Sequence, residues 1–218
     1  ILNHDDLDFQ KETLAKFNLN NIELINTFKN PDFHIQTENL YVPSYPNKHG
    51  TVNKWVCDEV KEMFQNEDIN KKKLDSKFAK QNSRLYISRR NKTGRNFINE
   101  EELFHLLEKF GFQKIYCEDY SIAEKVYIFG KVECVIGPHG SGLGNILFCN
   151  EGCTVVNIFS PNYFDTFIWS LANANKLKYH YFFGEGEIPI IENDITKRNI
   201  EIEINLDKFK KLITKILN

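Results

Sequence analysis

The sequence predicts an α/β fold in which a parallel sheet carries helices on both faces. From Arg84 to Leu217, strand patterns alternate with helix patterns of about ten residues, as in consecutive βαβ units. The short strands at 132–136 and 154–159 are almost continuously apolar, which is typical of strands buried on both faces. Rossmann-like sheets of this kind bind ligands at the carboxyl ends of their strands, near a change in strand order. Functional residues are therefore expected in the loops that follow the strands.

The expected elements follow one another regularly through this part of the chain. Strands are expected at 85–88, 112–117, 132–136, 154–159, 177–183 and 200–204. Helices are expected at 99–110, 121–130, 141–148, 163–174 and 206–217. Ser121 and Glu124 have the spacing of a capping box, which places one helix start at Ser121.

The N-terminal part has shorter and less regular elements. A helix is expected over 8–17 and strands at 22–25 and 40–42. Pro43 and Pro46 then interrupt the chain before a helix expected at 51–65, with Thr51 as its cap. The polar segment 66–80 fits a solvated helix or loop. We therefore expect a domain boundary that separates residues 1–45 from residues 46–218.

Composition excludes several classes of protein. The 28 basic and 30 acidic residues give a net charge of −2, which argues against a nucleic-acid partner held by phosphate contacts. A hydrophobic fraction of 41% excludes a wholly disordered chain. No apolar run approaches the roughly 18 residues of a transmembrane helix. The chain starts at Ile1 without a signal peptide, so we expect a fragment or a processed form. The oligomeric state is not predicted.

A glycine-rich turn follows the apolar strand at 132–136. The stretch from Val135 to Asn145 is VIGPHGSGLGN, so a strand is expected to enter a tight turn and then a helix. Glycines allow a backbone to approach a ligand, and free N–H groups at a helix start favour an anion. His139 lies in this turn and can hydrogen-bond a phosphate or a hydroxyl. Two interpretations stay open: a phosphate-binding turn, or a structural turn with a structural histidine.

Arginines follow the strand expected at the start of the sheet. Arg89 is predicted at its carboxyl edge, where a guanidinium can hold a phosphate through two parallel hydrogen bonds. Arg95 lies in the next polar loop and can add positive charge. The alternative interpretation of Arg89 and Arg90 is that they are ordinary charged surface residues rather than ligands of a phosphate. Asn99, which follows in the same segment, is also interpreted as a helix cap.

Other nucleotide or metal motifs fit poorly. A dinucleotide fingerprint has a glycine at its sixth position, where this turn has Asn145, and the Gly-Lys-Ser/Thr of a triphosphatase loop is absent. Asp6 and Asp8 have no flanking apolar strand. Cys149 and Cys153 have no further ligands nearby in the sequence. We expect no metal site, and a reducing cytoplasm fits the five cysteines.

Several spaced blocks together resemble glycosyltransferase family 61, the family of capsular polysaccharide biosynthesis type proteins. The blocks are ISR at 87–89, Arg95, NEEEL at 99–103, GF at 111–112 and HGSGLGN at 139–145. Further similarity is found at 40–44, at 169–172 and at Tyr179. The resemblance covers most of residues 40–180. The family also includes eukaryotic transferases that act on secreted proteins and plant transferases that decorate xylan.

The resemblance implies a GT-B architecture, in which two Rossmann-like domains face a cleft and the C-terminal one holds a nucleotide sugar. Residues 1–45 would be the tail of the N-terminal, acceptor-side domain, and residues 46–218 the donor-binding domain. The implied reaction is inverting transfer of a sugar to a hydroxyl of a glycan or protein, in polysaccharide biosynthesis. UDP is the expected nucleotide, no cofactor is expected, and the location is the cytoplasm, free or membrane-associated, or the ER or Golgi lumen in a eukaryote.

The implied donor site consists of the loops after two strands. Its residues are Ser88, Arg89, Arg95, His139, Gly140, Ser141, Gly142 and Asn145. Arg89 and the glycine turn would neutralise the diphosphate leaving group, and such charge stabilisation is usually the largest catalytic contribution. His139 is the candidate catalytic residue, while the general base is expected outside this chain.

Three features depart from the family's pattern. Gly144 stands where the family usually has threonine, and Asn157 stands where it often has an acid suited to ribose hydroxyls. A motif of the N-terminal half, with a histidine beside an aromatic residue and a nearby acid, is missing. Two alternatives therefore stay open beside the transferase: a non-catalytic nucleotide- or sugar-binding module of the same fold, and a nicotinamide-dependent oxidoreductase, which Asn145 disfavours.

Overall fold

A computed structural model places the chain in two compact units, residues 1–46 and residues 47–218. The structure describes residues 7–17, 29, 32, 34, 36–42, 44, 50–78, 83–90, 96–161, 163–186 and 201–217. The regular element described in the first unit is helix α1 (Asp8–Leu14). The strand predicted at 22–25 lies outside the described residues. The strand predicted at 40–42 is wrong, because these three side chains are exposed and have no paired strand.

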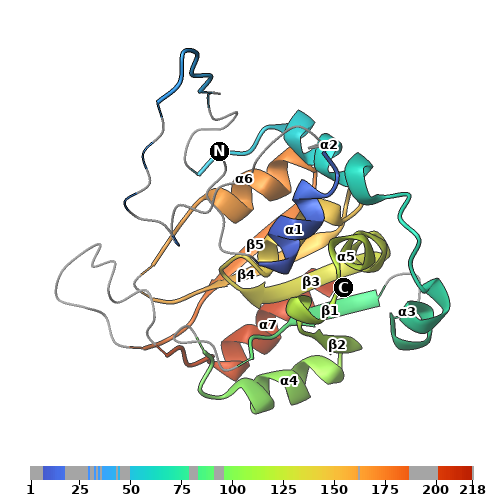
Figure 1. Cartoon of the computed structure of the whole chain (residues 1–218). Coiled ribbons are helices and arrows are strands. Elements are labelled where there is room, and N and C mark those ends of the chain that lie inside the picture. Colours follow the sequence, from blue (N-terminus) through green and yellow to red (C-terminus); the bar gives the residue numbers. More distant parts are fainter. Residues whose placement is uncertain are drawn as a thin grey trace. The chain divides into compact units, whose positions relative to one another are not determined.

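The second unit contains a five-stranded sheet in which all neighbours are parallel, which confirms the predicted fold class (Figure 1). The strands are β1 (Ser83–Ile87), β2 (Phe112–Ile115), β3 (Val132–Pro138), β4 (Thr154–Phe159) and β5 (Lys178–Phe183). Their order in the sheet is β2-β1-β3-β4-β5. The chain runs outward from β1 to β2 and then outward on the other side from β3 to β5. The direction changes between β1 and β3, which is where sheets of this kind bind ligands.

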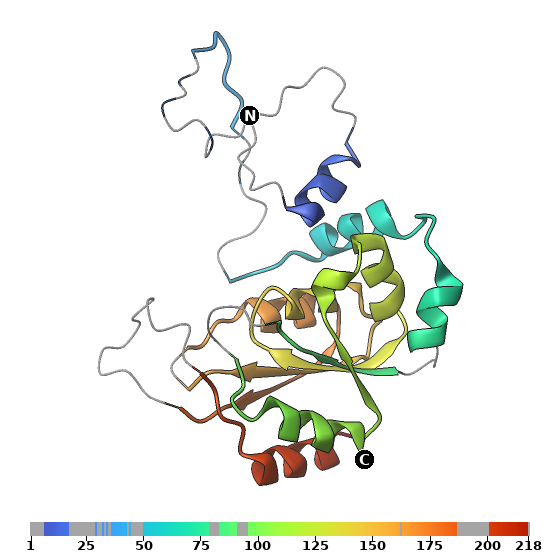
Figure 2. The same cartoon turned by 60° about the horizontal axis from the view of Figure 1, so that its bottom comes forward.

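Helices cover both faces of the sheet, as predicted (Figures 1 and 2). The elements that pack together on one face are α2 (Lys54–Phe64), α3 (Lys71–Phe78), α5 (Ile122–Phe129), the 3-10 helix η2 (Leu143–Phe148) and α6 (Phe167–Ala174). The elements on the other face are α4 (Glu100–Glu108) and α7 (Leu206–Leu217). A short 3-10 helix, η1 (Cys117–Asp119), follows β2.

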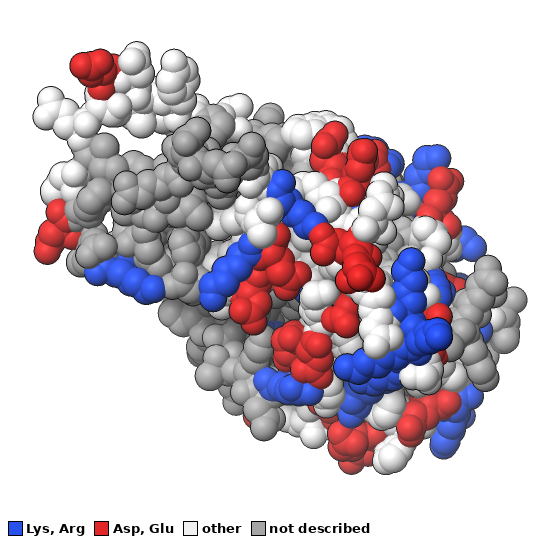
Figure 3. All heavy atoms as spheres, turned by 45° about the vertical axis from the view of Figure 1, so that its right-hand side comes forward, with Lys and Arg blue, Asp and Glu red and all other residues white. Residues whose placement is uncertain are grey.

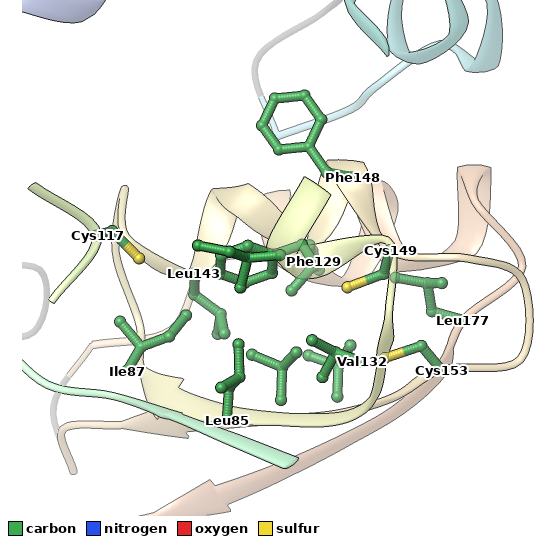
Figure 4. Packing of buried hydrophobic residues seen from close by; sticks show 14 of the residues in the cluster. Leu85, Ile87, Cys117, Phe129, Val132, Leu143, Phe148, Cys149, Cys153 and Leu177 are labelled. Atoms are coloured by element: carbon green, nitrogen blue, oxygen red, sulfur yellow. The ribbon is translucent and has the colours of Figure 1, made fainter. Parts of the chain in front are cut away.

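Alternate residues of the central strands supply two hydrophobic cores. Leu85 and Ile87 of β1 face the core beneath η2, where Leu143 packs (Figure 4). Tyr86, between them, belongs to the other core, which contains Phe209 of α7. This division follows from the two-residue period of a strand, whose side chains point alternately to opposite faces. All five side chains are at most 2% exposed, so β1 is fixed from both sides.

The helix starts show how local sequence and distant contacts compete. The predicted capping box is confirmed: Ser121 Oγ accepts from Glu124 N at 3.1 Å, and Glu124 Oε2 accepts from Ser121 N at 2.9 Å. The helix predicted from Thr51 begins instead after Asn53. Asn99 precedes α4 but its side chain makes no cap bond. Its amide instead bonds both backbone groups of Ile204, at 2.8 and 2.9 Å, so Asn99 occupies the predicted cap position but its side chain does not cap the helix.

The C-terminal segment joins the sheet region through isolated bridges rather than through a strand. Ile202 pairs with Phe97, and Glu203 pairs with Glu185. The predicted strand at 200–204 is therefore wrong for its described residues. The predicted helix at 206–217 is confirmed as α7. Gly184 allows the close approach, because a Cβ built there would lie 2.0 Å from Ile202 Cγ2.

Charges of both signs are interspersed on the face shown in Figure 3. Described ion pairs include Arg84 with Glu133 at 2.5 Å and Lys131 with Asp75 at 2.7 Å. Surface pairs of this kind are screened by solvent and contribute little to stability. Among the described helices, none is both long enough and apolar enough to cross a membrane.

Candidate functional site

The carboxyl ends of β1 and β3 bring together two loops that lie about fifty residues apart in the sequence. Ser88 and Arg89 directly follow β1, and His139 directly follows β3. Arg84 of β1 pairs with Cys134 of β3 in parallel, so both strands end at the same edge of the sheet. The structure therefore places the two predicted loops side by side, at the point where the strand order changes direction.

The glycine turn has three consecutive backbone N–H groups without a protein partner. The N–H groups of Gly140, Ser141 and Gly142 donate to no described residue, while their carbonyls accept from residues 143, 144 and 145. Gly140 has φ +153°, a conformation that favours glycine. Successive N–H groups freed by a turn form a concave site for an anion.

The predicted helix at 141–148 is wrong in type, because the segment is a six-residue 3-10 helix that begins at Leu143. The turn bonds run from residue i+3 to residue i, which is the 3-10 pattern. Gly142 and Gly144 lower the helix propensity of the segment and explain the difference. The positive field at this turn therefore comes from three free N–H groups rather than from a helix dipole.

His139 is held by contacts on several sides. Its ring stacks on Phe159 at a centroid distance of 4.7 Å and lies 5.4 Å from the ring of Tyr163. Asn157 Nδ2 lies 3.2 Å from His139 Nδ1 and donates to the Tyr179 hydroxyl at 2.9 Å. The Asn157 amide and the two aromatic rings hold the His139 ring from several sides. His139 is 8% exposed, and these contacts fix the plane of its ring.

Asn157 was not recognised from the sequence as a partner of His139. It lies within β4 and is completely buried, so it does not occupy the ribose-binding position that the resemblance implied. Burial raises the pKa of Tyr179, its second partner, which therefore stays protonated. Asn157 Oδ1 and Ser160 Oγ are buried and have no hydrogen-bond partner among the described residues. One polar residue within an otherwise apolar strand was the available signal.

Replacing Asn157 with alanine is expected to lower the free energy of unfolding by about 1–3 kcal/mol, because buried His139 and half-buried Tyr179 each lose their contact with the amide. Tyr179→Phe removes only one of these bonds and should cost about 0.5–1.5 kcal/mol. Urea denaturation of the three proteins measures both changes. An Asn157→Ala protein as stable as the parent would show that the amide does not hold His139.

The Ser88 side chain is buried and its hydroxyl bonds to another residue of the protein. Its hydroxyl donates to Glu100 Oε1 at 2.5 Å, and the Tyr86 hydroxyl donates to the same oxygen at 2.9 Å. Burial and the Glu100 carboxylate raise the pKa of Tyr86 well above its usual range, which keeps this donor protonated. Ser88 thus connects the end of β1 to α4, and only its lone pairs remain for a ligand.

The two arginines after β1 differ in their surroundings. Arg89 is half-buried, and its Nη1 nitrogen is inaccessible to solvent. Arg90 is exposed, bonds Asp119 at 2.5 Å and lies over the ring of Tyr116 at 4.6 Å. Surface charge is therefore the right interpretation for Arg90, and Arg89 is the arginine that lies at the edge of the sheet. Arg95 lies outside the described residues.

Asn145 and the glycines shape the turn. Asn145 Nδ2 donates to the Gly142 carbonyl at 2.8 Å, which stabilises the turn from its far side. Gly142 has φ −59°, so other residues could adopt its backbone, but a Cβ there would lie 3.3 Å from Ile87 Cγ2. Its lack of a side chain lets η2 pack on β1. At Gly144 a Cβ would meet no atom within 4 Å.

The described residues contain no group of three or more His, Cys, Asp or Glu that could hold a metal. Cys149 and Cys153 are buried and free. A hydrogen bond with Cys153 and burial raise the pKa of the Cys149 thiol, so it stays protonated. Asp6, the partner proposed for Asp8, lies outside the described residues.

The all-parallel sheet with helices on both faces defines the chain as a Rossmann-like α/β protein with its candidate site at the carboxyl edge. The sequence matches the family Glycosyltransferase 61 over residues 8–156, which is more than half of the chain. The chain belongs to this family, and the predicted resemblance is confirmed. The match includes β1, β3 and the whole glycine turn. No curated protein matches the sequence.

Proposed function

We propose that this glycosyltransferase domain binds the diphosphate of a nucleotide sugar at the carboxyl ends of β1 and β3. The reaction is inverting transfer of the sugar to a hydroxyl of a glycan or protein, in polysaccharide biosynthesis, with UDP as the nucleotide. The observation that supports it most is the row of three unpartnered N–H groups at Gly140–Gly142, close to the change in strand direction. Arg89 at the neighbouring strand end supplies a full positive charge.

In this proposal the turn and Arg89 bind the leaving group. Negative charge grows on the diphosphate as its bond to the sugar breaks, and donors already in place stabilise it in the transition state. The His139 ring hydrogen-bonds a phosphate oxygen or a sugar hydroxyl, and Asn157 holds the ring in the required orientation. His139 is the candidate catalytic residue of this chain, and the general base is expected outside it.

The carboxylates nearest to these loops are also engaged. Glu100 accepts from Ser88 and Tyr86, and Asp119 is paired with Arg90. These two carboxylates are therefore already engaged by donors of the protein. The general base is expected outside this chain. This expectation makes a donor-binding module without turnover the second candidate function.

Calorimetric titration with UDP and GDP, followed by an assay of sugar release from the nucleotide sugar, tests the proposal. We expect UDP to bind with a Kd that rises with salt, because phosphate contacts carry the affinity. Sugar release would support the transferase. Binding without release would favour the non-catalytic module. If neither nucleotide nor inorganic pyrophosphate binds, the proposed site is wrong.

Donor binding is expected to need no divalent metal, since Arg89 and the turn N–H groups supply the positive field. UDP affinity in excess EDTA should equal UDP affinity in manganese within about twofold, a difference below 0.5 kcal/mol. A tenfold gain with manganese would contradict this expectation. It would direct attention to Asp8 and its neighbours in the first unit.

A further inference from the structure

A group of aromatic side chains extends from His139 across the ends of β4 and β5. Phe159 lies at its centre and is fully buried. Phe164 and Phe183 lie on the solvent side of Phe159, with ring centroids at 5.2 and 5.5 Å, and they are 59% and 43% exposed. Tyr181 continues the group, 5.7 Å from Phe183. We call Phe164 and Phe183 the aromatic platform.

The platform is continuous with the candidate diphosphate site. Phe159 stacks on His139 at 4.7 Å and contacts both rings of the platform, so two ring contacts separate His139 from Phe164. His139 is the residue next to the three free N–H groups. A single ligand with an anionic end and a flat apolar end can therefore contact the three N–H groups and the aromatic platform at the same time. Large aromatic rings left exposed at such a site commonly mark a binding surface.

We propose that the aromatic platform is the stacking surface for the nucleobase of the donor, an inference that rests on the proposed function. A nucleoside diphosphate combines the two chemistries that lie next to each other here, an anion and a planar ring. Stacking of a base on an aromatic side chain contributes about 1–3 kcal/mol. A buried hydroxyl without a described partner, Ser160 Oγ, lies directly after Phe159 in the chain, where a polar group of the nucleoside can satisfy it.

The geometry of the platform specifies how the base binds. The ring centroids of Phe164 and Phe183 are 6.4 Å apart with an interplanar angle of 36°. Inserting a base between two parallel rings needs about 7 Å, two contacts of about 3.5 Å each. The base therefore lies across the exposed faces rather than between the rings. Every base has such a face, so the platform accepts both uracil and guanine, and a purine stacks over a larger area.

The test compares UDP, GDP and inorganic pyrophosphate by calorimetry on the full chain and on Phe164→Ala and Phe183→Ala. We expect UDP and GDP affinity to fall about 5- to 150-fold, and pyrophosphate affinity to stay within twofold of the parent. Phe164→Leu keeps an apolar contact with Phe159 but removes the ring face, and it should lose most of the same affinity. Trp169→Ala is the matched control, because Trp169 is 51% exposed on α6 but belongs to no described ring pair.

The outcomes separate the two proposals. Pyrophosphate binding with unchanged UDP affinity in both alanine variants would overturn the platform and leave the diphosphate site intact. Loss of pyrophosphate binding together with UDP binding would show that the rings merely support the turn. If the parent binds neither ligand, both proposals are wrong. Unchanged UDP binding combined with weaker binding of an acceptor oligosaccharide would assign the rings to the acceptor instead.

Discussion

Gly140→Val is expected to remove measurable UDP binding, with a loss of at least about 100-fold. The parent residue has φ +153°, which a β-branched residue adopts only at a cost of about 1–3 kcal/mol. Relief of that strain rotates the peptide groups on either side, and the N–H groups of Gly140 and Ser141 turn away from their common ligand. Two charge-assisted hydrogen bonds of about 1.5–3 kcal/mol each are then lost, which corresponds to 100-fold or more.

Gly144→Ala is the matched control, since a Cβ there meets no atom within 4 Å and the backbone is not left-handed. It should bind UDP like the parent. Circular dichroism and thermal melting establish that Gly140→Val remains folded, and only a folded variant counts. A folded Gly140→Val protein with parental UDP affinity would mean that the segment is a structural turn, the alternative interpretation left open by the sequence.

Arg89→Ala is expected to weaken UDP binding by about 30-fold, or about 2 kcal/mol, as for the loss of a bidentate charge-assisted contact. Arg89→Lys keeps the charge but not the planar fork, and it should recover only part of the affinity. Titration with UDP at two salt concentrations measures both effects. The salt dependence should be weaker in Arg89→Ala, because one phosphate contact is missing.

Arg90→Ala controls for the general loss of positive charge at this edge. Arg90 is the next residue, is exposed and is paired with Asp119, so UDP affinity should change less than threefold. An equal loss of UDP affinity in Arg89→Ala and Arg90→Ala would indicate that the arginines attract the phosphate at long range, and that Arg89 makes no direct contact with it. Because Arg89 is half-buried, its variant is also expected to melt a few degrees lower, and UDP affinity must be compared well below that temperature.

The sheet could be predicted because its signals are local. The strands are short segments rich in apolar residues that alternate with helix patterns, and in βαβ units this pattern alone indicates parallel pairing. The capping box at Ser121 is equally local, since its two members lie three residues apart. The resemblance to Glycosyltransferase 61 was likewise found from short blocks of sequence, and the family match over residues 8–156 confirms it. Strand order, by contrast, was not predicted, because it depends on which apolar faces meet.

The features that were not predicted correctly depend on contacts between residues that are distant in the sequence. Asn99 has the residue type of a helix cap, but it bonds Ile204, 105 residues later. Asn157 contacts His139 from the neighbouring strand, and its polarity within an apolar strand marks it as unusual without identifying His139 as its partner. The segment after Gly140 was expected to be an α-helix because its apolar spacing is helical. Spacing does not distinguish an α-helix from a six-residue 3-10 helix that follows a glycine-rich turn.

The bonds between Asn99 and Ile204 also constrain the order in which the chain folds. The core on the α4 side contains Ile202, Phe209 and Ile213, each at most 1% exposed, and all come from the last described segment. On the ribosome, the surface of the sheet that these side chains cover is therefore uncovered until that segment has been made. Parallel pairing over long sequence separations is already slow. A nascent chain of this protein thus leaves part of one apolar face of its sheet exposed until residues 202–213 have been made, which is the condition under which chaperones bind.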